Sequence, residues 1–376
     1  MRKKANIALN GLFLKHNNTG GGKYFFSLIE ELPKTENLFN CFIFLNNKIA
    51  KNYSAQRNIE FIDCGLLTKS RPFRLIWENL LLAPTLRKFK IDLLHATGFT
   101  LPANISCKSV ITIFDMTFFT MPQAHMKSKV AYFKSMIPLA LNKSDKVITI
   151  SHQTKNDILR LFKVPENKIK VIHIGISDKY RVIHDMADFK KRKKLPKDYI
   201  LFVGTIEPRK NLKNLVFAYD RLKKQGIEHK LLIVGSYGWG NKDIFCQIEK
   251  LGLVDDIIFT GFVDESDLIY IYNGASVFVY PSFYEGFGIP VIEAMKCGVP
   301  VATSNTSSMA EIATGAAILF NPHSPEEIAD SIYKILADIQ LADSLKKQGL
   351  ERAKIFTTAE MLSQTLAVYK ETLNTN

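Results

Sequence analysis

The chain has 376 residues, of which 47% are hydrophobic and 23% are charged, a composition that excludes an intrinsically disordered or low-complexity protein. Because a single hydrophobic core stops growing at roughly 250–300 residues, this length predicts two domains. The net charge of +14 is uneven: residues 1–175 carry 26 Lys and Arg against 11 Asp and Glu, and the remaining residues carry 24 against 25.

The N-terminus combines Met1-Arg-Lys-Lys with an apolar run from Ala5 to Leu14, which superficially resembles a signal peptide. Asn6 and Asn10 interrupt this run, and no small-residue cleavage site follows it. We therefore expect a first strand that leads into a glycine-rich loop. No apolar stretch of the sequence approaches the roughly 18–20 residues that span a bilayer.

Short apolar runs alternate with helical patterns along the chain. The strand candidates are Asn6–Asn10, Asn40–Leu45, Asp92–Ala96, Ser109–Phe114, Lys146–Ile150, Ile169–Ile174, Tyr199–Gly204, Lys230–Gly235, Ile257–Thr260, Ser276–Tyr280, Pro300–Thr303 and Ala316–Phe320. The clearest amphipathic helices are Leu212–Lys224, Asp264–Tyr272 and Pro325–Leu336. Apolar strands separated by helices indicate parallel sheets, so we predict an α/β fold with two Rossmann-like, doubly wound domains facing a cleft.

The domain boundary is expected in a cationic stretch. Gly175 ends a strand, and Lys190-Lys-Arg-Lys-Lys-Leu-Pro-Lys197 is more typical of an exposed linker than of a binding motif. We predict an N-terminal domain over 1–175, a linker over 176–198 and a C-terminal domain over 199–357. A last helix near Thr358–Thr372 follows the final strand–helix unit, and we expect residues 358–376 to cross back to the N-terminal domain.

The five cysteines, at positions 41, 64, 107, 246 and 297, are odd in number, scattered and never spaced as metal ligands. Such usage is typical of a reducing compartment and indicates no structural zinc. We therefore expect a cytoplasmic protein.

Three loops follow predicted strands and open helices, where open parallel sheets bind ligands. The first loop lies in the segment 280–298. There Pro290 suits the first turn of a helix and Gly298 suits its C-terminal cap. Gly288 lets a ligand approach the backbone, and the free N–H groups of the helix start favour a phosphate. Glu285 and Glu293 offer acceptors to a sugar ring and a ribose; the alternative is that they are ordinary turn and helix residues.

The other two loops carry cations and glycines. Arg209 and Lys210 follow the strand that ends at Gly204, and they can neutralise charge on a departing diphosphate, although such a pair is often simply exposed. Thr19-Gly-Gly-Gly22, before a helix expected from Tyr24 to Leu32, permits close approach of a phosphate or sugar. It is neither Gly-x-Gly-x-x-Gly nor a Walker A loop.

Together these motifs resemble those of the retaining GT-B glycosyltransferases of family 4. Glu285 and Glu293 match the family's Glu-x7-Glu element in the setting Glu-Gly-Phe-Gly-x-Pro-x-x-Glu-Ala, and Gly204-Thr-Ile-Glu-Pro-Arg-Lys-Asn211 is similar to its diphosphate-binding loop. Ser307-Ser-Met-Ala-Glu-Ile and Ile148–Asp157 also fit, so the resemblance covers nearly the whole chain.

The resemblance implies roles for particular residues. Glu285 would bond the hydroxyls of the donor sugar, Glu293 the ribose and Lys210 the diphosphate. Many members have an arginine directly after the strand glycine, where this chain has Thr205, and the arginine of this loop is Arg209. The implied catalytic residues are Arg209, Lys210 and Glu285, and the implied donor-binding residues are Gly21, Gly22, Thr205, Phe287, Gly288, Ile289 and Glu293.

One departure concerns the strand that ends at Phe114. Many members carry His-Asp there, and the histidine touches the donor sugar, whereas this chain has Phe114 followed by Asp115. Retention in the family is thought to use front-face attack, with the leaving diphosphate accepting the acceptor's proton, so this loss need not abolish activity. Asp115 is a candidate for an acceptor contact, the alternative being capping, and we expect His95 to support the cleft floor.

The loop after Gly204 and the segment Asp115-Met-Thr-Phe-Phe-Thr-Met-Pro122 are similar to bacterial mannosyl- and rhamnosyltransferases of surface-polysaccharide (O-antigen, capsule and lipopolysaccharide) biosynthesis. This implies a hexosyltransferase with GDP-mannose as the first donor to consider. No Asp-x-Asp motif lies in a suitable loop, so we expect no metal cofactor.

The excess of positive charge in residues 1–175 suggests partners. This charge can act only to keep the protein soluble, or it can attract an anionic membrane surface, a polyanionic substrate or nucleic acid. Its cations do not cluster with aromatic residues, so we predict no nucleic-acid partner and favour peripheral contact with the inner face of the cytoplasmic membrane, with a polyprenyl-diphosphate-linked glycan as acceptor. The alternatives are a GT-B nucleotide-sugar epimerase and a catalytically inactive sugar-nucleotide or nucleic-acid binding protein.

Overall fold

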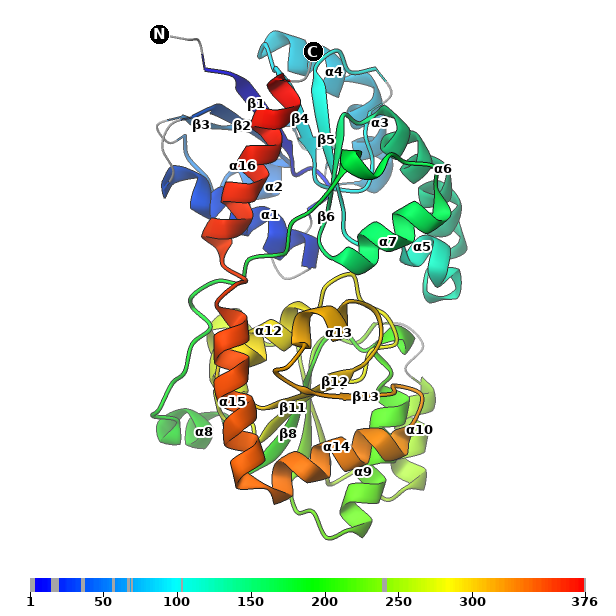
Figure 1. Ribbon diagram of the computed structural model, residues 1–376, viewed down its shortest axis with the longest axis vertical. Helices are drawn as coiled ribbons and strands as arrows, with labels where there is room; N and C mark the ends of the chain where they lie inside the picture. The colour runs from blue at the N-terminus through cyan, green and yellow to red at the C-terminus, as the bar shows by residue number, and fades with distance from the viewer. Residues whose placement is uncertain are drawn as a thin grey trace. The chain divides into compact units, whose positions relative to one another are not determined.

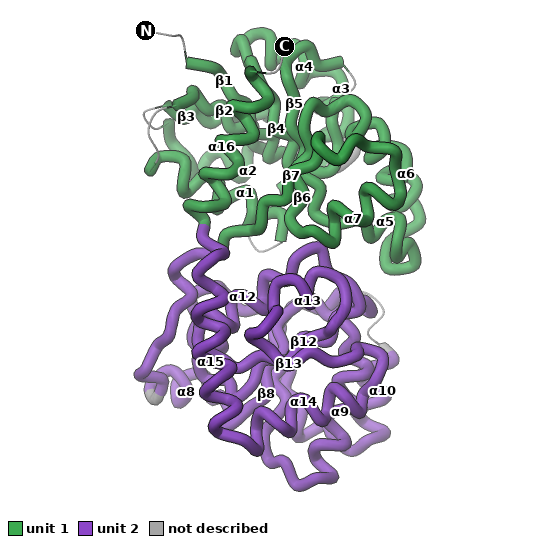
Figure 2. The backbone as a smooth tube through the Cα atoms, viewed as in Figure 1, with its two compact units in different colours: residues 1–175, 358–376 green, residues 176–357 purple. Residues whose placement is uncertain are grey.

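The computed structural model describes residues 4–14, 20–34, 38–55, 58–65, 68, 70–102, 104–238 and 242–374. The chain forms two compact units: unit 1 comprises Met1–Gly175 with Thr358–Asn376, and unit 2 comprises Ile176–Thr357 (Figure 2). Each unit has a parallel β-sheet with helices on both faces (Figure 1), which confirms the predicted doubly wound α/β fold. No helix within the described ranges is long and apolar enough to cross a membrane.

The sheet of unit 1 has seven strands in the order β3-β2-β1-β4-β5-β6-β7. They are β1 (Asn6–Asn10), β2 (Asn40–Leu45), β3 (Ile59–Asp63), β4 (Leu93–Ala96), β5 (Lys108–Ile113), β6 (Lys146–Thr149) and β7 (Ile169–Val171). The central strands β1, β4 and β5 are almost wholly buried. β3 escaped prediction because it lies at the sheet edge, where the exposed Glu60 and Asp63 interrupt its apolar run.

The described helices of unit 1 cover this sheet. They are α1 (Gly20–Glu31), α2 (Asn47–Ala50), α3 (Arg71–Leu80), α4 (Leu82–Lys88), α5 (Thr117–Thr120), α6 (Lys127–Lys143), α7 (His152–Leu161) and α16 (Thr358–Asn374), with 3-10 turns at Leu32–Lys34, Pro122–Ala124 and Glu166–Lys168. Our prediction of a glycine turn before a helix from Tyr24 was wrong, because α1 already begins at Gly20. Packing of its buried face, which includes Tyr24 and Phe25, overrides the low helix propensity of glycine. Thr19 lies outside the described residues.

The sheet of unit 2 has six parallel strands in the order β10-β9-β8-β11-β12-β13. They are β8 (Tyr199–Val203), β9 (Lys230–Val234), β10 (Ile257–Gly261), β11 (Val277–Tyr280), β12 (Val301–Ser304) and β13 (Ile318–Phe320). The described helices are α8 (Ala187–Lys193), α9 (Leu212–Lys224), α10 (Lys242–Lys250), α11 (Glu265–Asn273), α12 (Ile289–Lys296), α13 (Ser307–Ala313), α14 (Pro325–Ala337) and α15 (Ile339–Ala353), with a 3-10 turn at Pro208–Lys210.

The segment 176–198, expected as a linker, belongs to unit 2 and contains the helix α8. Its cationic run is anchored by Phe189, which is 4% exposed and stacks on Tyr270 of α11 with ring centroids 4.6 Å apart. Lys193 forms an ion pair with Asp267 at 2.6 Å. Phe189 and Lys193 thus help to seat the segment on the domain.

Helix α16 belongs to unit 1, where a buried histidine holds it. His95 of β4 is fully buried, and its Nδ1 lies 2.6 Å from the hydroxyl of Tyr369 of α16. Its Nε2 lies 2.7 Å from Oγ1 of Thr112 of β5, which also contacts the hydroxyl of Tyr24 of α1 at 3.1 Å. A neutral imidazole has one donor and one acceptor nitrogen, so it satisfies both neighbours without a buried charge. His95 is a core residue.

We predict that His95→Gln flattens the acid dependence of the stability of unit 1. Burial lowers the pKa of His95 from 6.5 to about 3. Between these two pH values His95 is therefore protonated in the unfolded chain and neutral in the folded chain. The free energy of unfolding should therefore fall as the pH drops from 6.5 toward 3, by about 1.4 kcal/mol per pH unit, and the variant should lack this contribution.

Urea unfolding followed by fluorescence would measure this dependence. The chain has two tryptophans, so a Trp239→Phe background leaves Trp77 to report on unit 1. Tyr369→Phe is the control, since it removes one hydrogen bond, about 1 kcal/mol, and keeps the histidine and its pH slope. An unchanged slope in His95→Gln would contradict the prediction.

Candidate active site

The residues assigned to catalysis lie in loops that follow two adjacent strands of unit 2. Arg209 and Lys210 belong to the 3-10 turn after β8, and Glu285 lies in the loop after β11. The strand order runs from β8 through β9 to β10 on one side and from β11 to β13 on the other. Where the order reverses in this way, the loops of the two neighbouring strands diverge and leave a crevice that binds ligands.

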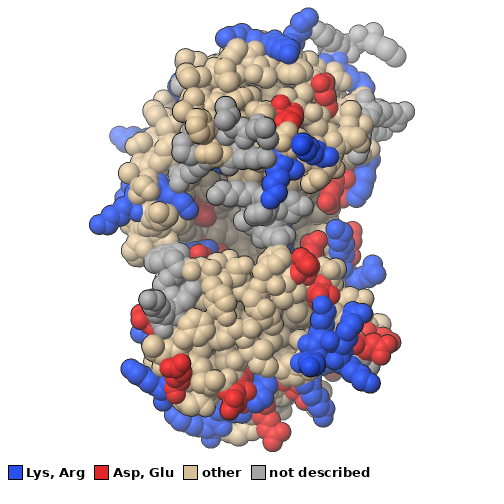
Figure 3. Space-filling model, turned by 180° about the vertical axis from the view of Figure 1, so that it is seen from behind, with Lys and Arg blue, Asp and Glu red and all other residues tan. Residues whose placement is uncertain are grey.

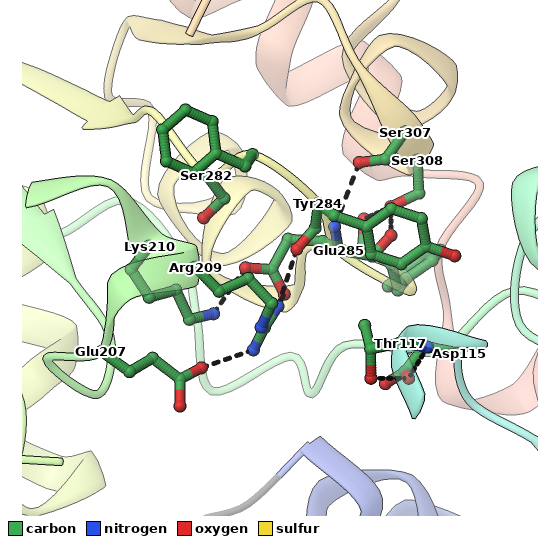
Figure 4. A network of polar contacts seen from close by, with 12 residues as sticks. Asp115, Thr117, Glu207, Arg209, Lys210, Ser282, Tyr284, Glu285, Ser307 and Ser308 are labelled. Atoms are coloured by element: carbon green, nitrogen blue, oxygen red, sulfur yellow. Dashed lines mark hydrogen bonds and ion pairs between the residues drawn. The ribbon is translucent and has the colours of Figure 1, made fainter. Parts of the chain in front are cut away.

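Glu285 is bound by two cations, as Figure 4 shows. Its Oε1 accepts a hydrogen bond from Nζ of Lys210 at 2.6 Å, and its Oε2 lies 2.6 Å from Nη1 of Arg209. Lys210 also donates to the hydroxyl of Tyr280 at 2.6 Å, and Arg209 pairs with Glu207 at 2.7 Å. Lys210 and Glu285 are each 8% exposed. The structure thus brings the three assigned residues together in a largely dehydrated cluster.

The charges in this cluster control ionisation. Burial acts to raise the pKa of Glu285, but Arg209 and Lys210 outweigh it through charge and hydrogen bonds, and the pKa falls to about 2. Burial lowers the pKa of Lys210, against the opposing effect of Glu285. Burial, reinforced by the charge of Glu285, raises the pKa of Tyr280 well above its ordinary value. Glu285 is therefore an ionised acceptor at neutral pH, while Tyr280 remains a donor.

Two serines at the start of α13 hold the Glu285 loop. Oγ of Ser307 accepts a hydrogen bond from the amide of Glu285 at 3.1 Å. Oγ of Ser308 donates to the carbonyl oxygens of Glu285, at 2.9 Å, and Phe287, at 2.7 Å. Sequence reasoning noted these serines only as part of a family pattern. Hydroxyl residues at a helix start do signal bonds to backbone, but only the fold identifies the loop as their partner.

The helix expected after this loop is present. α12 begins at Ile289 with Pro290 in its first turn, and Gly298 follows its end with a φ of +69°. Gly288 precedes the helix at a φ of +115°, and a Cβ there would lie 2.4 Å from Cε of Met309. Both the backbone conformation and the available space therefore require glycine.

The other predicted donor residues of unit 2 differ in their access to solvent. The side chains of Phe287 and Ile289 are buried, and Phe287 packs edge-on against Phe356 with ring centroids 5.6 Å apart. Any contact of these two residues with a donor would therefore be made by their backbone atoms. Thr205 is exposed after β8. Glu293 is 1% exposed, and its Oε2 accepts a hydrogen bond from Tyr272 of α11 at 2.9 Å. Its ribose contact stays a prediction.

In unit 1, the position of the missing histidine is filled by an aromatic cluster. Phe114 is 8% exposed and makes edge-on contacts with Tyr24, at 5.3 Å, and Phe99, at 5.5 Å. A Cβ on Gly21 would lie 3.2 Å from the ring of Phe13 and 3.4 Å from that of Phe114. Gly21 thus allows α1 to pack on these rings, and Gly22, the next residue of α1, is buried.

Asp115 forms the turn that opens α5. Its Oδ1 accepts hydrogen bonds from the amide of Thr117, at 2.9 Å, and from the Thr117 hydroxyl, at 2.5 Å (Figure 4). The hydroxyl donates its single proton to Asp115, so it accepts from Nε2 of His125, which lies 2.8 Å away. Asp115 therefore caps this turn, which is the alternative to an acceptor contact. Sequence reasoning missed His125, because ten residues separate it from Asp115.

This arrangement in unit 2 suits an anionic, hydroxyl-rich ligand. Two fixed cations can bind phosphate oxygens, and the ionised Glu285 can accept hydrogen bonds from hydroxyl groups. Among the described residues, a single group of three or more His, Cys, Asp or Glu side chains is spaced so that it could hold a metal ion. It consists of His152, His173 and Glu311 and does not include Glu285.

The fold and this cluster define the class of protein. Two Rossmann-like parallel-sheet units are the GT-B architecture, and solved structures share this fold. Sucrose-phosphate synthase from Thermosynechococcus elongatus superposes with a TM-score of 0.79 at 23% identity, over 98% of this chain and 99% of that chain. Anabaena Alr3699/HepE, solved with UDP and glucose, gives a TM-score of 0.77 at 16% identity, over 98% and 100%.

Sequence comparison identifies the family. The models of Glycosyltransferase Family 4 and of Glycosyl transferases group 1 match residues 19–180 and 185–352. The O-antigen chain mannosyltransferase B of Escherichia coli is 33% identical over 291 residues, which cover 76% of each chain. The chain belongs to the family 4 glycosyltransferases, and it is a transferase. The resemblance, the GT-B fold and the enzyme class inferred from the sequence are confirmed.

We predict that Gly288→Ala destabilises unit 2 more than Gly315→Ala does. Both glycines have positive φ, at +115° and +71°, but the space around Gly315 is open within 4 Å, whereas a Cβ at Gly288 would meet Met309 and Ile312. We expect a loss of about 1 kcal/mol for Gly315→Ala and about 3 kcal/mol for Gly288→Ala. Urea unfolding in a Trp77→Phe background would measure both, and equal losses would contradict the crowding argument.

Proposed function

We propose that this glycosyltransferase moves a hexose, with mannose as the first candidate, from a nucleotide-sugar to a growing bacterial surface glycan. The observation that carries the proposal is the cluster of Lys210, Arg209 and Glu285 at the switch point of the unit 2 sheet. The choice of mannose is supported by the name of the Escherichia coli relative, an O-antigen chain mannosyltransferase, and GDP-mannose is the donor that we test first.

In this proposal the two cations act on the leaving group. Lys210 and Arg209 bind the diphosphate and offset the negative charge that develops on it as the bond to the sugar breaks. Glu285 accepts hydrogen bonds from the sugar hydroxyls, which its low pKa allows at neutral pH. The family mechanism passes the acceptor's proton to the leaving diphosphate, so it does not need a histidine at the position of Phe114.

The proposed acceptor is a glycan linked to polyprenyl diphosphate at the inner face of the cytoplasmic membrane. Unit 1 carries the entire charge excess, with 27 Lys and Arg against 13 Asp and Glu, while unit 2 carries 23 of each. A cationic domain is attracted to anionic lipid, which would bring the enzyme to a lipid-linked acceptor.

Two other functions are separable by experiment. An epimerase would convert a nucleotide-sugar with no acceptor present, and an inactive protein would bind one without turnover. Neither is favoured by the relatives, which are named as transferases. Incubation of the purified chain with GDP-mannose, once alone and once with the glycan acceptor, distinguishes all three: an epimerase converts the sugar in both, a transferase consumes the donor when the acceptor is present, and an inactive protein does neither.

We predict that Lys210→Gln and Glu285→Gln affect different parts of the donor. Lys210→Gln should weaken GDP and GDP-mannose alike, by about 10-fold or more, because it removes a charge-assisted bond to the diphosphate. Glu285→Gln should keep most of the affinity for GDP and lose the added affinity that mannose confers. Calorimetric titration of each variant with both ligands would measure this difference.

Lys223→Gln is the matched control for the loss of one cation in unit 2. Lys223 lies in the last turn of α9 and pairs with Asp256 at 3.2 Å, outside the Glu285 cluster. It should bind both ligands as the wild type does. The proposed diphosphate site would be contradicted if the Lys210→Gln protein bound GDP, and also UDP, with the affinity of the wild type.

We also propose that transfer needs no metal ion, since Lys210 and Arg209 supply the positive charge that a divalent cation gives other transferases. Transfer of radiolabelled mannose from GDP-mannose to lipid-extracted acceptor should therefore keep at least half of its rate in excess chelator. Complete loss that magnesium restores would refute this proposal.

A further inference from the structure

Helix α3 of unit 1 presents large apolar side chains to solvent. Phe73, Ile76, Leu80 and the following Leu81 are 51%, 53%, 68% and 51% exposed, and we call these four residues the α3 stripe. The spacing of the first three, at i, i+3 and i+7, places them on one side of the helix. Single exposed apolar residues are common, but four on one helical segment mark a contact surface.

A buried hydrogen bond between α3 and the sheet holds the helix with this stripe facing solvent. Glu78, the single carboxylate of α3, is 8% exposed, and its Oε1 accepts a hydrogen bond from Nδ2 of Asn10 of β1 at 3.1 Å. Its Oε2 lies 3.8 Å from Nε of Arg74. α3 therefore buries its acid and exposes Phe73, Ile76 and Leu80, the reverse of what these residue types do on an ordinary surface helix. Turning the stripe inward would break the Glu78–Asn10 bond.

The surroundings of the stripe favour an anionic partner. The sequence from 64 to 91 contains no acidic residue other than the buried Glu78, whereas Arg87, Lys88 and Lys90 are exposed directly after the stripe. On the face shown in Figure 3, blue cationic side chains prevail over unit 1, the upper part of the view, while both signs are interspersed over unit 2. Nucleic acid would meet the cations but leave the four apolar side chains without an apolar partner, whereas an anionic bilayer offers both phosphates and acyl chains.

We propose that the α3 stripe inserts into the boundary between headgroups and acyl chains of an anionic phospholipid bilayer, with Arg87, Lys88 and Lys90 beside the lipid phosphates. Amphipathic helices bind membranes through this combination of apolar insertion and cationic attraction. The inference rests on the proposed lipid-linked acceptor for its choice of a bilayer, and it assigns that contact to one helix.

Sedimentation with vesicles of phosphatidylcholine and phosphatidylglycerol, compared with phosphatidylcholine alone, tests the proposal. Wild-type protein should bind the anionic vesicles, and Phe73→Ser with Leu80→Ser should lower the partition coefficient about 10-fold or more. Ile339→Ser with Ile355→Ser is the matched control, because these residues of unit 2 are 77% and 51% exposed and lie outside the stripe. The control should bind vesicles as the wild type does.

A second pair of variants tests the cationic part. Arg87→Gln with Lys88→Gln should weaken binding at low salt and flatten its salt dependence, whereas Lys191→Gln with Arg192→Gln in α8 should not. Loss of binding in the α8 variant, or wild-type binding by the stripe variant, would overturn the proposal. So would a wild-type dimer, seen by light scattering, that the stripe variant dissociates.

Donor binding separates this inference from the proposed function. The stripe variants should bind GDP-mannose with the affinity of the wild type. If no nucleotide-sugar binds any of these proteins, the proposed function fails; if the donor binds and the stripe variants still sediment with anionic vesicles, only the membrane contact fails.

Discussion

The dehydrated contact between Glu285 and its two cations is the interaction on which the candidate site depends. A buried carboxylate without partners is strongly unfavourable, so Glu285 is tolerated in this loop only because Lys210 and Arg209 reach it. That requirement ties the loop after β8 to the loop after β11, which in turn requires the two strands to be neighbours. The serines of α13 then fix the backbone so that the carboxylate cannot withdraw. The same cations are thereby positioned before any ligand arrives, which lowers the reorganisation needed to bind one.

The sequence predicted the strands and the helix that carry this cluster, because their determinants are local. Apolar runs mark the strands, Pro290 and Gly298 mark the ends of α12, and parallel strands bring loops that follow them to one edge of a sheet. What it could not predict depends on contacts between distant segments. The bond from Tyr272 to Glu293 and those from Ser307 and Ser308 to the Glu285 loop join residues about 20 positions apart through the fold.

Unit 1 shows the other limit of sequence reasoning. The helix start at Gly20, the edge strand β3 and the outward apolar face of α3 all run against the local preference of their residues. In each case packing against the rest of the unit decides the outcome. Phe114 is instructive here, since it occupies the position of a polar family residue and is stabilised by Tyr24 and Phe99. Unit 1 is therefore apolar at the position where the resemblance implies a histidine, and its polar groups begin one residue later, at Asp115.

The bond between His95 and Tyr369 has a consequence for biosynthesis. The two residues are 274 positions apart, and all of unit 2 lies between them in the chain. Unit 2 is continuous and can fold as soon as it leaves the ribosome, whereas unit 1 cannot complete its core until α16, which follows unit 2 in the chain, has emerged. Of these two units, the one whose synthesis starts first is therefore completed last, and its core stays open while unit 2 is made.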